Sequence, residues 1–112
     1  MTVEAVTREE LQAQLESGDS MVLIDALSPL SYATSHLPGA INMTPEWVDA
    51  RAPRLIPDLD ADVVVYCSSA ICDSSTVVAN RLRELGYRHV RHYVEGKRDW
   101  QAAGLPLEGR GS

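Results

Sequence analysis

The sequence lacks phenylalanine, and aromatic residues of all kinds make up only 5% of its 112 residues. A core must therefore be built mainly from Leu, Val, Ile and Ala, with Trp47 and Trp100 as large anchors. No apolar run approaches the length of a membrane span, which argues against a membrane partner. The first residues also lack the basic start and apolar centre of a signal peptide, so we expect a cytoplasmic protein.

Basic residues are the minority among the charges, since 10 Lys and Arg against 16 Asp and Glu give a formal net charge of −6. Nucleic acids and anionic membranes are bound through basic surfaces, so neither is predicted as a partner. The bases are concentrated in the last third of the chain. That segment either attracts a small anion or acidic partner or forms the solvated faces of two helices, and the second interpretation is favoured.

Cysteine is scarce as well, because the chain has only Cys67 and Cys72. Together with the three histidines they match no zinc-site spacing, so a metal site is not predicted. Thiols in a reducing compartment stay reduced, and we therefore do not expect a permanent structural disulfide between the two residues.

Helices and short apolar strands alternate along the chain. Thr7 and Glu10 fit a capping box that begins a helix, and Gly18 is placed to end it. Residues 62–66 give the clearest strand pattern. Further strands are predicted at residues 21–26, within 36–43 and at 89–94, and further helices at 29–34, from 44, at 76–85 and at 97–104.

This alternation predicts an α/β domain with a mostly parallel central sheet flanked by helices on both faces. The length predicts one domain over residues 1–112, with a core at about 5–108 and a flexible tail at 109–112. Pro53 and Pro57 are expected to interrupt the helix that begins at residue 44.

Cys67 follows the best strand directly and precedes a predicted helix. Ligands of parallel sheets bind beyond the carboxyl ends of the strands. Backbone N–H groups and the helix dipole favour a thiolate there, which makes Cys67 a candidate nucleophile. The alternative is a buried, inert cysteine. The candidate anion-binding loop comprises Ser68, Ser69, Ala70, Ile71, Asp73, Ser74 and Ser75, of which Ser74 or Ser75 is also a candidate helix N-cap.

Three stretches in order resemble the single-domain rhodanese-like proteins. They are LIDALSPLSYATSHLPGAINM at 23–43, VVVYC at 63–67 and LRELGYRHVRHYVEGKRDWQAAGLPLE at 82–108. The resemblance implies a rhodanese-like fold and a sulfurtransferase without an organic cofactor. It also implies that Cys67 accepts a sulfane sulfur from a small anion or persulfide donor and passes it to a thiol or other nucleophilic acceptor. In this family pattern Asp25 and His36 are expected to hold turns by hydrogen bonds.

The loop departs from the common family pattern in two ways that weaken anion binding. It is about two residues longer, and it has no Lys or Arg. Thiosulfate activity is therefore expected to be weak, because a lost charge-assisted contact costs roughly 1.5–3 kcal/mol. Arg51, Arg54 and Arg98 are candidates for supplying the missing charge. The missing guanidinium also argues against the phosphatase branch of this fold.

Cys72 gives the loop a C-x-x-x-x-C pattern and has two open interpretations. It is either a resolving thiol for Cys67 or a small apolar side chain that packs beneath the loop beside Ile71. The alternatives to sulfur transfer are a thiol–disulfide reductase that uses the Cys67–Cys72 pair and a non-catalytic interaction module. The sequence leaves the physiological donor, the acceptor and the oligomeric state open.

Overall fold

The computed structural model describes residues 3–110, in which a single five-stranded sheet forms the centre. Its strand order is β1-β5-β4-β2-β3, and every neighbouring pair is parallel. The strands are β1 (Glu4–Ala5), β2 (Val22–Asp25), β3 (Ile41–Asn42), β4 (Asp62–Tyr66) and β5 (His89–Tyr93). This confirms the predicted parallel α/β architecture.

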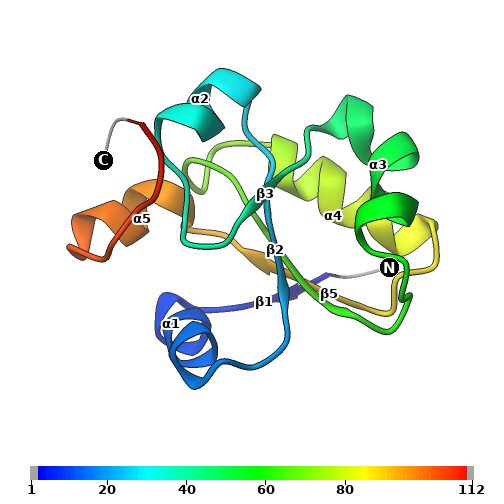
Figure 1. Ribbon diagram of the computed structural model, residues 1–112, viewed down its shortest axis with the longest axis horizontal. Coiled ribbons are helices and arrows are strands. Elements are labelled where there is room, and N and C mark those ends of the chain that lie inside the picture. The colour runs from blue at the N-terminus through cyan, green and yellow to red at the C-terminus, as the bar shows by residue number, and fades with distance from the viewer. Residues whose placement is uncertain (1–2, 111–112) are drawn as a thin grey trace.

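Helices cover both faces of this sheet, as Figure 1 shows. They are α1 (Arg8–Ser17), α2 (Pro29–Thr34), η1 (Pro45–Trp47, a 3₁₀ turn), α3 (Val48–Leu55), α4 (Ser74–Glu84) and α5 (Gly96–Ala102). Val48 of α3 and Leu82 of α4 belong to one buried cluster, whereas Leu11 of α1 and Trp100 of α5 belong to the other. The sheet therefore separates two apolar layers.

The predicted caps of the first helix are confirmed, and the second helix is capped in a similar way. Thr7 Oγ1 accepts a hydrogen bond from the Glu10 N–H, and the Glu10 carboxylate accepts one from the Thr7 N–H. Gly18 ends α1 with a φ of 76°. Ser28 caps α2 by accepting the Ser31 N–H at 3.2 Å. These local signals are independent of the rest of the fold, which is why the sequence reveals them.

The expected interruption at Pro53 is wrong, because Pro53 lies inside α3. Proline leaves only one carbonyl of a helix without its donor, and α3 has just 8 residues. Pro53 is exposed, so the helical turn that lacks the hydrogen bond faces solvent. Ala52 and Ile56 are buried and pack the helix against the core. Pro57 follows the helix.

The chain returns to α2 before the described residues end. Glu108 exchanges backbone hydrogen bonds with His36, and the Arg110 N–H donates to Ala33 O at 2.9 Å. Of the predicted tail at 109–112, residues 111 and 112 lie outside the described residues. Across residues 3–110, every helix is too short or too polar to span a bilayer.

Candidate active-site loop

The loop that begins at Cys67 lies at the carboxyl edge of the middle strand. Tyr66, the last residue of β4, pairs with Asp25 of β2 on one side and Tyr93 of β5 on the other. Cys67 follows it and is 1% exposed. Among the other predicted loop residues, Ser75 is buried, Ser68, Ser69, Cys72 and Ser74 are half-buried, and Ala70, Ile71 and Asp73 are exposed.

The first turn of α5 fixes the start of this loop through backbone groups. The Lys97 N–H donates to Cys67 O at 2.8 Å, and the Arg98 N–H donates to Ser68 O at 2.9 Å. Gly96 has a φ of +72°, and a Cβ on it would lie 2.5 Å from Cys67 O. Only glycine combines that backbone conformation with such a close approach. This anchoring role of α5 was not predicted from the sequence, although glycine is the usual residue where two backbones approach closely.

This anchoring orients the next amide groups. In a trans peptide the C=O and the following N–H point in opposite directions. Because α5 binds the carbonyls of Cys67 and Ser68, the N–H groups of Ser68 and Ser69 point away from α5. Within residues 3–110 neither N–H donates to a protein acceptor. Two adjacent free amides of this kind are suited to an anion.

A tight turn brings the second cysteine back to the first. The Cys72 N–H donates to Ser69 O at 3.1 Å and closes a turn with Ala70 and Ile71 at its corner. The Cα atoms of Cys67 and Cys72 lie 6.1 Å apart, and their sulfurs are joined in a disulfide. The structure thus differs from the expected pair of reduced thiols. The turn brings the two cysteines within bonding distance, and the sequence does not predict the path of this turn.

Ile71 does not pack beneath the loop, which contradicts the interpretation that Cys72 packs there beside it. The Ile71 side chain is 90% exposed, since it occupies a corner of the turn. The loop therefore presents an apolar tip to solvent.

The start of α4 also differs from the prediction that Ser74 or Ser75 is its N-cap. Asp73 precedes the helix and makes no capping hydrogen bond through its side chain. Ser75 lies in the first turn, where its Oγ is 2.7 Å from His92 Nε2 on β5. Burial lowers the pKa of His92, so the neutral ring is favoured. This contact between buried Ser75 and half-buried His92 connects α4 to β5.

The candidate cations have different positions. The Arg51 guanidinium lies over the Trp47 ring, 3.8 Å from its centroid. Arg54 is exposed on α3, and Arg98 is exposed on α5 with its backbone bonded to the loop. The Lys97 ammonium donates to Ser31 Oγ and Ser35 O, which attaches α5 to α2. Among the three predicted arginines, Arg98 has a direct backbone contact with the loop.

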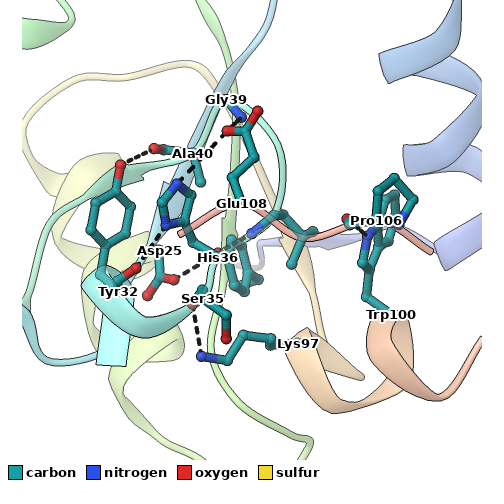
Figure 2. Close-up of polar contacts among 12 residues, drawn as sticks. Asp25, Tyr32, Ser35, His36, Gly39, Ala40, Lys97, Trp100, Pro106 and Glu108 are labelled. Carbon is teal, nitrogen blue, oxygen red and sulfur yellow. Dashed lines mark hydrogen bonds and ion pairs between the residues drawn. The ribbon is translucent and has the colours of Figure 1, made fainter. Parts of the chain in front are cut away.

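A buried hydrogen-bond network supports the neighbouring strand end (Figure 2). The Tyr66 hydroxyl donates to Asp25 Oδ2 at 2.7 Å and accepts the Leu37 N–H at 3.0 Å. Asp25 Oδ1 accepts the Leu27 N–H at 2.8 Å. Burial raises the pKa of Asp25, and the hydrogen bonds from Tyr66 and Leu27 oppose that rise.

His36 holds the turn before β3 through a separate set of contacts. Its Nδ1 lies 2.7 Å from Tyr32 O, and its ring stacks on Tyr32 with centroids 3.9 Å apart. The Tyr32 hydroxyl in turn donates to Ala40 O. The expectation that Asp25 and His36 hold turns by hydrogen bonds is thus confirmed.

Two further features of the described residues bear on other kinds of site. No group of three or more His, Cys, Asp or Glu gathers there in a way that would hold a metal ion. A surface hollow is lined by residues that include Asp62 and His89, which are the first residues of β4 and β5. It lies at the amino edge of the sheet, opposite Cys67, so it is separate from the loop.

The family model described as "Rhodanese-like domain" matches residues 7–103. The chain belongs to the rhodanese-like family. Its solved relatives agree with this fold. The solution structure of the rhodanese-like domain from the Anabaena sp. protein Alr3790 has a TM-score of 0.85 and 28% identity, and the match covers 98% of this chain and 82% of that domain.

Sulfurtransferases are among the curated relatives of this rhodanese-like chain. The thiosulfate sulfurtransferase GlpE of Haemophilus influenzae strain 86-028NP is 27% identical, with 96% of this chain and 97% of GlpE covered. The HTH-type transcriptional regulator Rv0324 of Mycobacterium tuberculosis is 33% identical over 94% of this chain but only 45% of the regulator. The chain spans about half the length of that regulator and of two further relatives.

Proposed function

We propose that this rhodanese-like protein is a sulfurtransferase in which Cys67 carries the sulfur as a persulfide. The main support is the position of Cys67 at the end of β4, where the amides of Ser68 and Ser69 are turned away from α5. Such preorganised donors stabilise an anionic sulfur without reorganisation. The sulfurtransferase relatives support the same reaction class.

The reaction begins with reduced Cys67. Its thiolate attacks the outer sulfur of a donor such as thiosulfate, the donor's S–S bond breaks, and sulfite leaves with the bonding electrons. A Cys67 persulfide remains, and the loop amides stabilise its charge. An acceptor thiolate then attacks the outer sulfur and releases the Cys67 thiolate. No oxidant or cofactor is consumed in this exchange.

The charge of the loop bears on the donor class. Its side chains supply no cation, and Asp73 adds a negative charge at its end. Thiosulfate carries two negative charges in a small volume and gains less here than in a site with a guanidinium. We therefore propose that low-molecular-weight persulfides or protein persulfides are better donors than thiosulfate.

Thiol–disulfide exchange is the second candidate function, and the disulfide between Cys67 and Cys72 favours it. In that case the pair passes electrons to a substrate disulfide and no sulfane sulfur is bound. The two functions differ in whether Cys67 ever gains a sulfur atom.

Two single variants test the proposed sulfur transfer. Cys72→Ser retains only Cys67, and Cys67→Ser retains only Cys72. After reduction, desalting and incubation with thiosulfate or glutathione persulfide without oxygen, we expect intact-mass spectrometry to show one added sulfur atom on Cys72→Ser and none on Cys67→Ser. Thr76→Ala, an exposed change on α4, serves as the control for handling.

The proposal fails if neither donor adds sulfur to Cys72→Ser while circular dichroism shows that the variant is folded. It also fails if Cys67→Ser gains sulfur as readily. A Cys72→Ala variant repeats the test in case serine alters the turn.

A further inference from the structure

The disulfide between Cys67 and Cys72 has no part in a simple sulfurtransferase cycle, which needs one thiol. We propose that Cys72 is a second catalytic residue that attacks the persulfide of Cys67 and releases sulfide. The protein would then convert sulfane sulfur to hydrogen sulfide at the expense of its own two thiols. This inference rests on the proposed sulfur transfer to Cys67.

The backbone positions Cys72 for that attack. The Cys72 N–H bond to Ser69 O turns the chain back, and α5 holds the carbonyls of Cys67 and Ser68 on the other side. The resulting Cα separation of 6.1 Å lies within the range of about 4.4–6.8 Å that disulfides require. The two thiols thus meet without bimolecular collision, an arrangement that strongly favours reaction.

The bonded atoms indicate which sulfur is attacked. A persulfide has an inner sulfur, the Sγ of Cys67, and an outer sulfur. The structure joins Cys72 Sγ to Cys67 Sγ, so the inner sulfur is within its reach. Attack there forms the Cys67–Cys72 bond and breaks the bond to the outer sulfur, which leaves as HS⁻ with the electron pair. The outer sulfur is reduced to sulfide, and the two thiols are oxidised to the disulfide.

After sulfide release the disulfide has to be reduced, and the exposure of the two cysteines indicates which sulfur the reductant attacks. Cys67 is 1% exposed, whereas Cys72 is half-buried. An external dithiol reductant therefore reaches Cys72 Sγ more easily, and thiol exchange depends on such access. Attack on Cys72 expels Cys67 as the thiolate, and the second thiol of the reductant then frees Cys72. The nucleophile is restored in its reactive form beside the Ser68 and Ser69 amides.

A single-turnover experiment without oxygen tests this sequence. Reduced wild-type protein, freed of reductant, receives one equivalent of glutathione persulfide, and both sulfide and intact mass are followed. We expect one sulfide per chain and a protein lighter by two hydrogen atoms. Cys72→Ser should instead keep the added sulfur and release no sulfide, and Thr76→Ala should behave like wild type.

Two results would overturn the inference while leaving sulfur transfer intact. One is a wild-type persulfide that persists like that of Cys72→Ser, without sulfide. The other is a sulfur atom that peptide mapping after alkylation finds on Cys72, which would mean attack on the outer sulfur. Failure of Cys72→Ser to gain any sulfur would overturn the proposed function and this inference together. Cys72→Ala provides the same comparison if Cys72→Ser is unfolded.

Discussion

In the proposed function, single residues in the loop determine how well an anionic donor is held. Cys67 is positioned by its neighbours, but the side chains around it are hydroxyl, apolar or acidic. The site therefore depends on backbone amides for positive potential, which are neutral dipoles rather than charges. Ile71, at the exposed corner of the turn, is the position where a charge can be added without disturbing packing.

Replacing Ile71 by Arg is expected to improve thiosulfate use. Its side chain is 90% exposed, so the change leaves the core intact. An exposed charge pair contributes roughly 0.2–1 kcal/mol, which corresponds to a gain in kcat/KM of up to about fivefold. The gain in kcat/KM is measured from initial rates of sulfur transfer from thiosulfate, with all variants made in the Cys72→Ser background. Ile71→Gln is the neutral control and Ile71→Glu should lower the rate, whereas equal rates for all three would contradict the electrostatic account.

Elements remote in sequence meet at the loop, and α5 is the most important of them. The N–H groups of Lys97 and Arg98 bind loop carbonyls, and Gly96 allows the two backbones to touch. The pair Ser75–His92 connects α4 to β5 from another side. The geometry of the loop is therefore set by elements that follow it in the chain.

Two glycine variants distinguish the cost of a close contact from the cost of backbone strain in the free energy of unfolding. Gly96 and Gly104 have similar φ values of +72° and +77°, but only at Gly96 would a Cβ meet other atoms within 4 Å. Gly96→Ala and Gly104→Ala share the cost of a left-handed alanine, about 1–2 kcal/mol. Overpacking adds typically 1–3 kcal/mol at Gly96 alone. Urea unfolding should show the larger loss for Gly96→Ala, and mass-monitored sulfur uptake should slow only there. Equal losses would mean that the contact with the loop is unimportant.

At the same scale, the sequence predicts the elements whose signals are local. The apolar runs of β2 and β4 and the caps of α1 depend on neighbouring residues, and these predictions are confirmed. The sequence does not predict strand β1, because its two residues, Glu4 and Ala5, are exposed and form too short a segment to show a pattern. They are a strand only through pairing with β5.

The candidate site is predictable to a similar extent. A cysteine after a buried parallel strand has to lie at the ligand-binding edge, so the position of Cys67 follows from the pattern. The disulfide and the exposure of Ile71 do not, because the path of the loop depends on hydrogen bonds within the turn and from α5. Those contacts join residues whose separation along the chain follows no helical or strand periodicity, so the sequence does not indicate them.

In the molecule as a whole, the candidate site lies at one edge of a fully parallel sheet. The carboxyl ends of β2, β4 and β5 meet there, with the Asp25–Tyr66 network beside the loop. The two apolar layers lie on the faces of the sheet and are separate from the loop. Changes in the oxidation state of the loop should therefore alter global stability without altering the fold.

Oxidation of the cysteine pair is expected to raise the free energy of unfolding modestly. The disulfide joins residues separated by 5 positions, and so short a loop gives about 2 kcal/mol in the chain-entropy account. Urea unfolding of wild-type protein with and without a dithiol reductant measures the difference. Cys72→Ser should unfold at the same urea concentration under both conditions. A larger shift, or a shift in that variant, would contradict a purely local crosslink.

The backbone bonds between α5 and the loop also have a consequence for protein engineering. Because main-chain atoms of Gly96, Lys97 and Arg98 hold main-chain atoms of Cys67 and Ser68, the anchoring does not depend on which side chains the loop carries. Residues 69–71 and 73 then form a cassette that can be exchanged while Cys67, Cys72 and helix α4 are kept. Libraries that randomise this cassette while keeping Gly96 should retain the fold and yield variants with altered donor preference.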